Sequence, residues 1–239
     1  MNKLRIQKLL AERGVASRRA VEEMIVDGRV SVNGKLVTQL PFFVEETDDI
    51  RIDGRRVAAQ PSRKIYILLN KPRGVVCTQK DSQGRPVATD LVPNLPSRVY
   101  CVGGLDVDST GLVLLTNDGE LTRLLTNPRR PLERLYVLEI DGQLNEEQMG
   151  QLKAGVFLEG HRTPRAAVRV LGHERNHSVL EVRVRESRNL DLRHVLAKLG
   201  HKVRRLKRVG FGPLTDKGIK IGHFRSLQPA EAAGLRGGA

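Results

Sequence analysis

The sequence predicts an α+β protein, in which two short helices and small strands precede a larger unit rich in strands. Apolar residues at Ile6, Leu9 and Leu10 follow the spacing of one helical face. Between residues 180 and 185, apolar and charged residues alternate, which is typical of a half-exposed strand. Turn sequences such as Asn33-Gly34 close several of the predicted strands.

The composition points to a polyanionic partner. The 239 residues carry a net charge of +14 and a pI near 10.4, which most often indicates nucleic-acid binding. Aromatic residues make up only 3% of the chain, with no Trp, and this argues against a base-stacking platform as the main binding device. The sequence shows no apolar signal segment and no run that could span a bilayer, so we expect a soluble, cytoplasmic protein without membrane contact.

The two cysteines do not have the spacing of a metal site. Cys77 and Cys101 form no Cys-x-x-Cys sequence and have no metal-ligating neighbours along the chain. We therefore expect two ordinary reduced thiols and no bound metal.

The first 60 residues predict a compact module of two helices and small strands. A helix over residues 3–13 is followed by a second helix that Ser17 can cap and Gly28 ends. Residues 30–35 and 50–54 predict strands that close in turns. The polar faces carry cations, which are taken as RNA-binding candidates at Arg5, Lys8, Arg18, Arg19, Arg29 and Lys35.

This module closely resembles the S4 RNA-binding domain over residues 3–53. The segments that carry the resemblance are Leu-Ala-Glu-Arg-Gly-Val-Ala-Ser-Arg-Arg-Ala and Ile-Val-Asp-Gly-Arg-Val-Ser-Val-Asn-Gly-Lys. The resemblance implies that the helices present Arg18, Arg19 and their neighbours to RNA phosphates, which gives affinity without base specificity. On charge alone, a merely solvated basic face is the alternative. We assign residues 1–60 to this domain and its linker.

The rest of the chain is organised around residues 102–119. Glycines surround Asp106 and Asp108, and a short apolar run follows that is long enough for a buried strand. This arrangement places a carboxylate on a tight loop. Asp-x-Asp-x-Thr also resembles the first motif of haloacid-dehalogenase-like phosphotransferases, but no later pair of aspartates follows to hold magnesium. A calcium loop would need Glu where Asn117 stands, and a solvated glycine-rich connection is the remaining alternative.

The full stretch Gly-Gly-Leu-Asp-x-Asp-x-Thr-Gly-Leu-x-Leu-Leu-Thr-Asn-Asp-Gly closely resembles the signature of the RsuA-like family of ribosomal RNA pseudouridine synthases. Asp106 falls on the family's catalytic aspartate, which acts as nucleophile or base. Gly104 falls where the family has an arginine that enters the space left by the flipped nucleotide. The resemblance implies a mixed, mostly antiparallel sheet over residues 61–231, which leaves residues 232–239 as a disordered tail.

Two further motifs supply candidate site residues. Arg134-Leu-Tyr136 resembles the family's Lys-x-Tyr segment, whose tyrosine stacks on the target uracil; strand alternation predicts a half-buried Tyr136. The run from Glu186 to Arg193 resembles the family's third motif, in which the last arginine ion-pairs with the catalytic aspartate. Arg193 is therefore expected to meet Asp106, on a helix that Asn189 can cap.

The remaining cations predict an RNA groove around this site. Most of the excess charge lies between Arg162 and Arg225, and the Lys-Pro-Arg-Gly sequence at residues 71–74 resembles a family motif. The RNA-binding candidates of this unit are Lys71, Arg73, Arg188, Arg204, Arg205, Lys207 and Arg208.

The resemblance implies an enzyme that isomerises a specific uridine in ribosomal RNA, with the large-subunit (23S-type) RNA favoured. It implies no metal, no organic cofactor and a monomer whose partner is ribosomal RNA or a ribosomal assembly particle. The alternative is a non-catalytic RNA-binding assembly factor on a decayed synthase fold. That alternative is supported by departures from the family pattern at Gly104, Ser187, Leu190 and Asp191.

Overall fold

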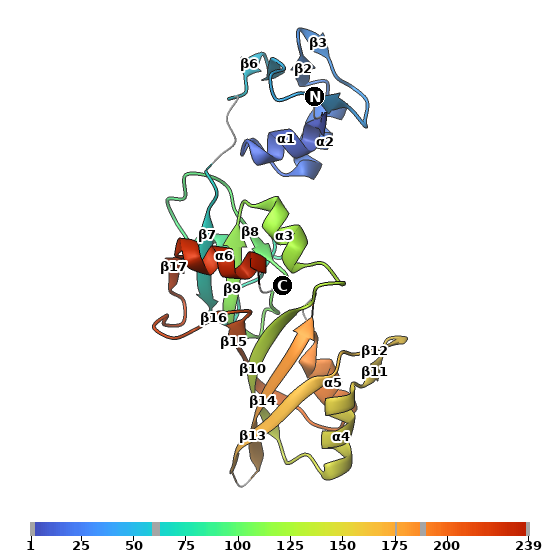
Figure 1. Cartoon of the computed structure of the whole chain (residues 1–239), viewed down its shortest axis with the longest axis vertical. Helices are drawn as coiled ribbons and strands as arrows, with labels where there is room; N and C mark the ends of the chain where they lie inside the picture. Colours follow the sequence, from blue (N-terminus) through green and yellow to red (C-terminus); the bar gives the residue numbers. More distant parts are fainter. Residues whose placement is uncertain (1–2, 59–62, 175, 187–189, 238–239) are drawn as a thin grey trace. The chain divides into compact units, whose positions relative to one another are not determined.

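The computed structural model describes residues 3–58, 63–174, 176–186 and 190–237. The chain divides into two compact units (Figure 1). The first comprises Met1–Ile65 with the short segments Leu95–Arg98 and Asn117–Gly119, and the second comprises the remainder. The boundary predicted at residue 60 and the Asn189 cap both lie outside the described residues. Within those residues, no helix combines the length and the apolar character needed to cross a membrane.

The first unit packs two helices against small antiparallel sheets. Its elements are α1 (Ile6–Glu12), α2 (Arg18–Val26), a sheet in the order β3 (Lys35–Leu36), β2 (Val30–Val32), β5 (Ile50–Ile52) and β6 (Arg55–Arg56), and the pair β1 (Leu4–Arg5) with β4 (Phe43–Val44). The Ser17 side chain accepts from the Ala20 amide at 3.2 Å, as predicted for a helix cap. The first helix is shorter than predicted, because Leu4 and Arg5 pair with β4 as a strand.

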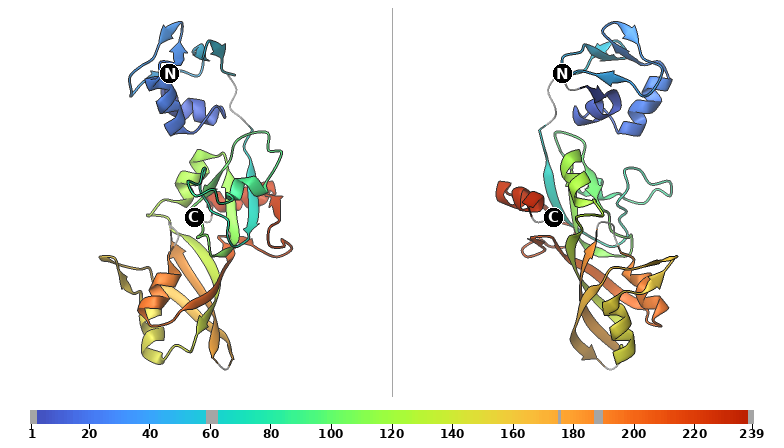
Figure 2. Two further views of the ribbon diagram at one scale, coloured as in Figure 1. Left: turned by 180° about the vertical axis from the view of Figure 1, so that it is seen from behind. Right: turned by 45° about the vertical axis from the view of Figure 1, so that its right-hand side comes forward.

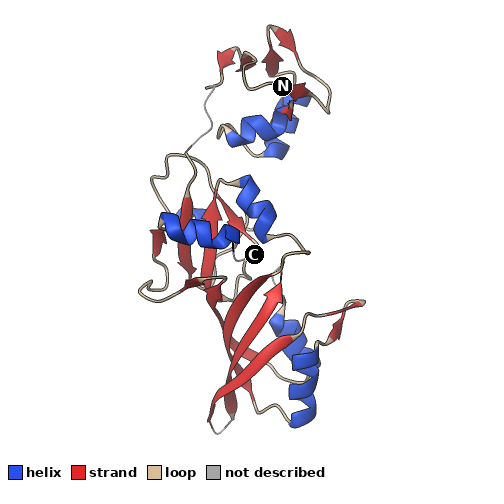
Figure 3. Cartoon of the chain, viewed as in Figure 1, coloured by secondary structure: helices blue, strands red, loops and turns tan. Residues whose placement is uncertain are grey.

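The second unit is built on one mixed sheet that is mostly antiparallel, as predicted (Figures 2 and 3). Its main path runs β13 (Ala166–Glu174), β14 (His177–Glu186), β10 (Leu132–Asp141), β15 (Val203–Phe211), β9 (Thr110–Thr116), β7 (Tyr66–Lys71) and β17 (Phe224–Ser226). At its edges, β8 (Tyr100–Val102) pairs with β9, and β16 (Leu214–Thr215) pairs with β15. A separate hairpin joins β11 (Phe157–Leu158) to β12 (His161–Arg162).

The helices of this unit are the 3-10 turn η1 (Ala88–Leu91), α3 (Gly119–Leu125), α4 (Glu146–Ala154), α5 (Leu192–Lys198) and α6 (Pro229–Gly237). The last of these corrects the sequence analysis, which expected disorder from Ala232 onward. Ala232 and Leu235 are buried, and Leu235 joins the apolar cluster that contains Leu121 and Phe211. Burial of these apolar side chains provides the free energy that orders the helix.

β9 and β15 approach each other closely where Gly111 meets Arg208. They are the parallel pair of the sheet, with Gly111 opposite Arg208. A Cβ at position 111 would lie 2.2 Å from the Arg208 carbonyl oxygen, and Gly111 has a φ of +112°. Only glycine fits this position, so the glycine of the central motif allows β9, the strand after the Asp106 loop, to lie against β15.

Candidate active site

Asp106 lies on the loop between β8 and β9. The chain leaves β8 through Gly103 and Gly104, whose φ values of +71° and +61° belong to the left-handed region that glycine adopts without strain. The amide of Ser109 donates to the Asp106 carbonyl oxygen at 3.1 Å and closes the loop. The half-buried Asp106 lines an open pocket of about 330 Å³ together with Val76, Cys77, Thr78, Gly103, Gly104, Leu105 and Val107.

The charged groups around Asp106 have opposing effects on its pKa. Burial raises the pKa of the Asp106 carboxyl above its ordinary value, and the neighbouring Asp191 carboxylate raises it further. The cations Arg193, Arg208 and Lys71 lower the pKa and offset part of this effect. These charged groups belong to α5, β15 and β7, which are far apart in the sequence. Their proximity to Asp106 could therefore not be predicted from residue spacing.

Arg193, the predicted partner of Asp106, lies in the first turn of α5. Its guanidinium donates to two backbone carbonyls, those of Val203 at 2.9 Å and Asp108 at 3.1 Å. The second bond ties α5 to the loop that carries Asp106. Asp191 caps this helix by accepting from the amides of Arg193 and His194, each at 3.1 Å. Asp191, which departs from the family pattern, thus serves as the N-terminal cap of α5.

Lys71 was predicted to bind RNA, but the structure places it inside the protein rather than at the surface. Its side chain is 0% exposed, and its ammonium donates to the carbonyls of Pro72 at 3.0 Å, Val75 at 2.8 Å and Val107 at 3.4 Å. Burial lowers the pKa of Lys71 to about 8. Lys71 therefore holds the loop after β7 to the Asp106 loop.

Tyr136 is more deeply buried than the strand pattern predicted. Only 1% of it is exposed, and its hydroxyl donates to Glu186 Oε1 at 2.6 Å. The Arg134 Nη1 donates to the same oxygen at 3.1 Å, and the Leu190 amide donates to Oε2 at 2.6 Å. Burial raises the pKa of both Glu186 and Tyr136, the latter to about 12. This network fixes the tyrosine ring on β10.

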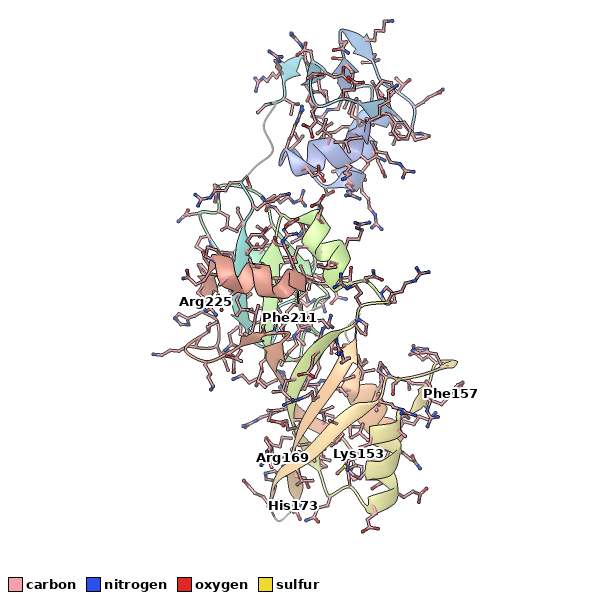
Figure 4. All side chains as sticks on the ribbon, viewed as in Figure 1. Lys153, Phe157, Arg169, His173, Phe211 and Arg225 are labelled. Atoms are coloured by element: carbon pink, nitrogen blue, oxygen red, sulfur yellow. The ribbon has the colours of Figure 1, made fainter. Side chains whose placement is uncertain are left out.

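Arg208 is a second predicted RNA contact that the structure places inside the protein. Its side chain is 0% exposed, and its Nε donates to the Leu112 carbonyl at 2.7 Å. The guanidinium carbons of Arg208 and Arg134 lie 5.3 and 5.4 Å from the centroid of Phe211, which Figure 4 labels. Alternation along β15 explains this burial, because the strand carries cations on both of its faces.

The other predicted RNA contacts of this unit lie at the surface. Arg204 and Arg205 are exposed and Lys207 is partly exposed. All three are close to carboxylates, of Asp141, Glu139 and Asp216 respectively. Arg73 is exposed and ion-pairs with Asp108 at 3.1 Å. Arg188 lies outside the described residues.

In the first unit, the predicted RNA-binding cations are accessible to solvent. Arg18 and Arg19 are exposed at the start of α2, and Arg5 and Lys35 are exposed on strands. Arg29 pairs with Asp53 at 2.6 Å. Lys8 is partly exposed and lies 3.7 Å from Glu12, one helical turn away.

Sequence reasoning missed two contributors to the site. Glu186 was recognised only as a motif match, although it holds Tyr136 and Arg134. Cys77 was taken as an ordinary thiol, yet it lines the pocket beside Asp106. A hydrogen bond from Cys101 and the charge of Lys71 lower the pKa of Cys77 to about 7. The sequence gives no signal for the role of Glu186 or of Cys77, because the side chains that form hydrogen bonds with each of them lie far away along the chain.

Comparison with known protein families places the chain among enzymes that act on RNA. Residues 65–198 match the family model of RNA pseudouridylate synthases, and residues 4–50 match the model of the S4 domain. The chain therefore belongs to the RNA pseudouridylate synthase family and carries an S4 domain ahead of its catalytic part.

Individual relatives are similar over nearly the whole chain. A ribosomal large subunit pseudouridine synthase B of Bacillus subtilis strain 168 is 39% identical, over 97% of this chain and 95% of that protein. The protein of the same name from Salmonella typhimurium strain LT2 is 38% identical, over 98% of this chain and 82% of that protein. A crystal structure of a pseudouridylate synthase matches with a TM-score of 0.69 and 27% identity, over 97% of this chain and 99% of that one.

Proposed function

We propose that this enzyme converts a uridine of large-subunit ribosomal RNA to pseudouridine, either on free RNA or on a cytoplasmic assembly particle. The observation that carries the proposal is the half-buried Asp106 on its glycine loop, beside a pocket and within the electrostatic influence of Arg193. The substrate class is supported by the names of the full-length relatives.

The reaction breaks the C1′–N1 bond of uridine and rejoins the uracil to ribose through C5. Asp106 serves as nucleophile or base in this exchange. Arg193 orients the loop through the Asp108 carbonyl and favours the ionised carboxylate. Tyr136 presents its ring to the base, which must leave the RNA stack to reach the site. The exposed cations of the S4 domain bind RNA phosphates.

The test is release of tritium from RNA labelled at C5 of uridine, measured for Asp106→Asn and for Asp108→Asn. Asp106→Asn should abolish release while RNA affinity stays nearly the same. Asp108→Asn is the matched control, because Asp108 is exposed and pairs with Arg73 at the surface. Substantial turnover by Asp106→Asn would refute the assignment. Mapping pseudouridine across ribosomal RNA from cells with and without the protein would then identify the uridine, and unchanged pseudouridine would favour the assembly-factor alternative.

A further inference from the structure

Arg208 is a buried cation whose two terminal nitrogens, Nη1 and Nη2, have no hydrogen-bond partner among the described residues. Its side chain is 0% exposed, and its Nε is bonded to the Leu112 carbonyl. Neither Nη1 nor Nη2 has a hydrogen-bond partner in the part of the chain that the structure describes. Buried donors that lack a hydrogen-bond partner reduce the stability of a protein. Nη1 and Nη2 are thus two buried hydrogen-bond donors for which the described residues provide no acceptor.

These donors lie beside the groups proposed to handle the substrate. Arg208 on β15 stands opposite Tyr136 on β10. Opposite residues in an antiparallel pair have Cβ atoms about 4.5–5.5 Å apart on the same face of the sheet. The charge of Arg208 also lowers the pKa of Asp106. A base that lies against Tyr136 is therefore within reach of the Arg208 guanidinium.

Arg134 provides the contrast. It packs over the same Phe211 ring at 5.4 Å, and Arg208 does so at 5.3 Å. Arg134 has a buried carboxylate partner, because its Nη1 donates to Glu186 at 3.1 Å. The two arginines pack on the same ring, but Arg134 has a carboxylate partner at Nη1, whereas both Nη groups of Arg208 lack a hydrogen-bond partner in the described part of the protein.

We propose that the Nη groups of Arg208 bind a carbonyl oxygen of the target uracil and stabilise the negative charge on the detached base. The inference rests on the proposed isomerisation. When the C1′–N1 bond breaks, its electron pair stays on N1 and is shared with O2 and O4. The ring electrons then form the C1′–C5 bond, the C5 proton leaves, and N1 takes up a proton. Donors aimed at developing charge in a buried site act as an oxyanion hole does.

Single-turnover tritium release tests the proposal with Arg208→Met and Arg208→Lys. Arg208→Met should slow the reaction about 100-fold, the scale seen when an oxyanion donor is removed. Arg208→Lys keeps the charge but loses the planar pair of donors, so its rate should lie between those of Arg208→Met and wild type. Arg169→Gln is the control, because Arg169 is an exposed arginine on β13 and its replacement should leave the rate unchanged (Figure 4).

The melting temperature separates this role from a structural one. Arg208→Met loses the hydrogen bond to the Leu112 carbonyl but breaks no buried ion pair, so the melting temperature should fall less than in Arg134→Met. Arg134→Met should lower it, because Glu186 would lose its buried ion-pair partner. A fall in melting temperature for Arg208→Met as large as that for Arg134→Met would overturn the proposal.

A substrate with a better leaving base gives a second, independent readout. Fluorine at C5 withdraws electrons and stabilises the uracil anion, so loss of Arg208 should slow cleavage of 5-fluorouridine less than that of uridine. Loss of 5-fluorouridine from nuclease-digested RNA measures that cleavage, with Arg208→Lys as well as Arg208→Met. Equal slowing on both substrates would overturn the inference. If the wild-type enzyme releases no tritium, both the proposed function and this inference are refuted. If the wild type is active and Arg208→Met is equally active, only this inference is refuted.

Discussion

The Nζ atom of Lys71 donates a hydrogen bond to the carbonyl oxygen of Val75 at 2.8 Å, inside the protein rather than at its surface. The same ammonium reaches the Val107 carbonyl, one residue beyond Asp106. Backbone carbonyls thus replace water around the buried ammonium, and the hydrogen bond to Val107 ties it to the Asp106 loop.

Replacement of Lys71 by Met should change how stability depends on pH. Burial lowers the pKa of Lys71 from 10.5 to about 8. Between these values the unfolded chain holds a proton that the folded chain has lost, so the Lys71 contribution to stability rises with pH. The free energy of unfolding of wild type, minus that of Lys71→Met, should increase between pH 8 and 10.5 in urea titrations. A constant difference would show that Lys71 keeps its ordinary pKa.

The fall of the single-turnover rate at acid pH should depend on the charged groups around Asp106. Burial raises the pKa of Asp106, so activity that needs the carboxylate should fall at a higher pH than an ordinary aspartate would dictate. Arg193→Gln removes a charge that lowers this pKa and should move the fall to higher pH. Asp191→Asn removes a charge that raises it, keeps a capping side chain, and should move the fall to lower pH. Single-turnover rates across pH would decide, and shifts of the same sign in both variants would contradict the assignment.

Cys77 should react with alkylating reagents as a thiolate near neutral pH. Its pKa is lowered to about 7, chiefly by a hydrogen bond from Cys101, so the rate of N-ethylmaleimide modification should rise through pH 7. Because Cys77 lines the Asp106 pocket, modification should block turnover. Cys77→Ser should protect the enzyme, and Cys101→Ser should move the modification profile to higher pH. Inactivation that persists in Cys77→Ser would point to another target.

Gly104→Arg should speed turnover on structured RNA. The added Cβ would lie 3.7 Å from Cys77 Cβ, an ordinary contact, although a φ of +61° costs a side chain about 1 kcal/mol. An arginine that fills the space of the extruded nucleotide and contributes about 1.4 kcal/mol would accelerate a flipping-limited step about tenfold. Single-turnover rates on structured and unstructured substrates test this. Equal effects on both, or a slower rate on structured RNA, would show that position 104 does not govern flipping.

The S4 domain should supply affinity rather than chemistry. Arg18→Gln with Arg19→Gln should weaken RNA binding and lower the salt slope by about 0.7 for each phosphate of single-stranded RNA that the domain no longer neutralises. The matched control is Arg51→Gln with Arg56→Gln, in the same unit, because both of these arginines already pair with Asp49 at 2.9 Å. Titrations at two salt concentrations compare the slopes. An equally weakened affinity in the two double variants would indicate a nonspecific effect of net charge.

Local patterns predicted the elements of this protein better than they predicted its interior cations. The Ser17 cap, the hairpin strands and the mixed sheet follow from spacing and resemblance. Lys71 and Arg208 were assigned to RNA because charge usually signals exposure, and one of the carbonyls that bind Lys71, that of Val107, lies 36 residues further along the chain. The terminal helix was missed for a similar reason, since Leu235 is ordered by a core that lies far away in sequence.

The parallel pairing of β9 with β15 joins segments that are 96 residues apart, through the bond from Arg208 to Leu112. During synthesis the glycine loop and Asp106 leave the ribosome long before β15 exists. A nascent or truncated chain that ends before Val203 would contain the whole signature motif but lack Arg208 and the carbonyl that anchors Arg193. With the roles proposed for Arg193 and Arg208, the site is completed only late in translation, when the newly made β15 pairs with β9.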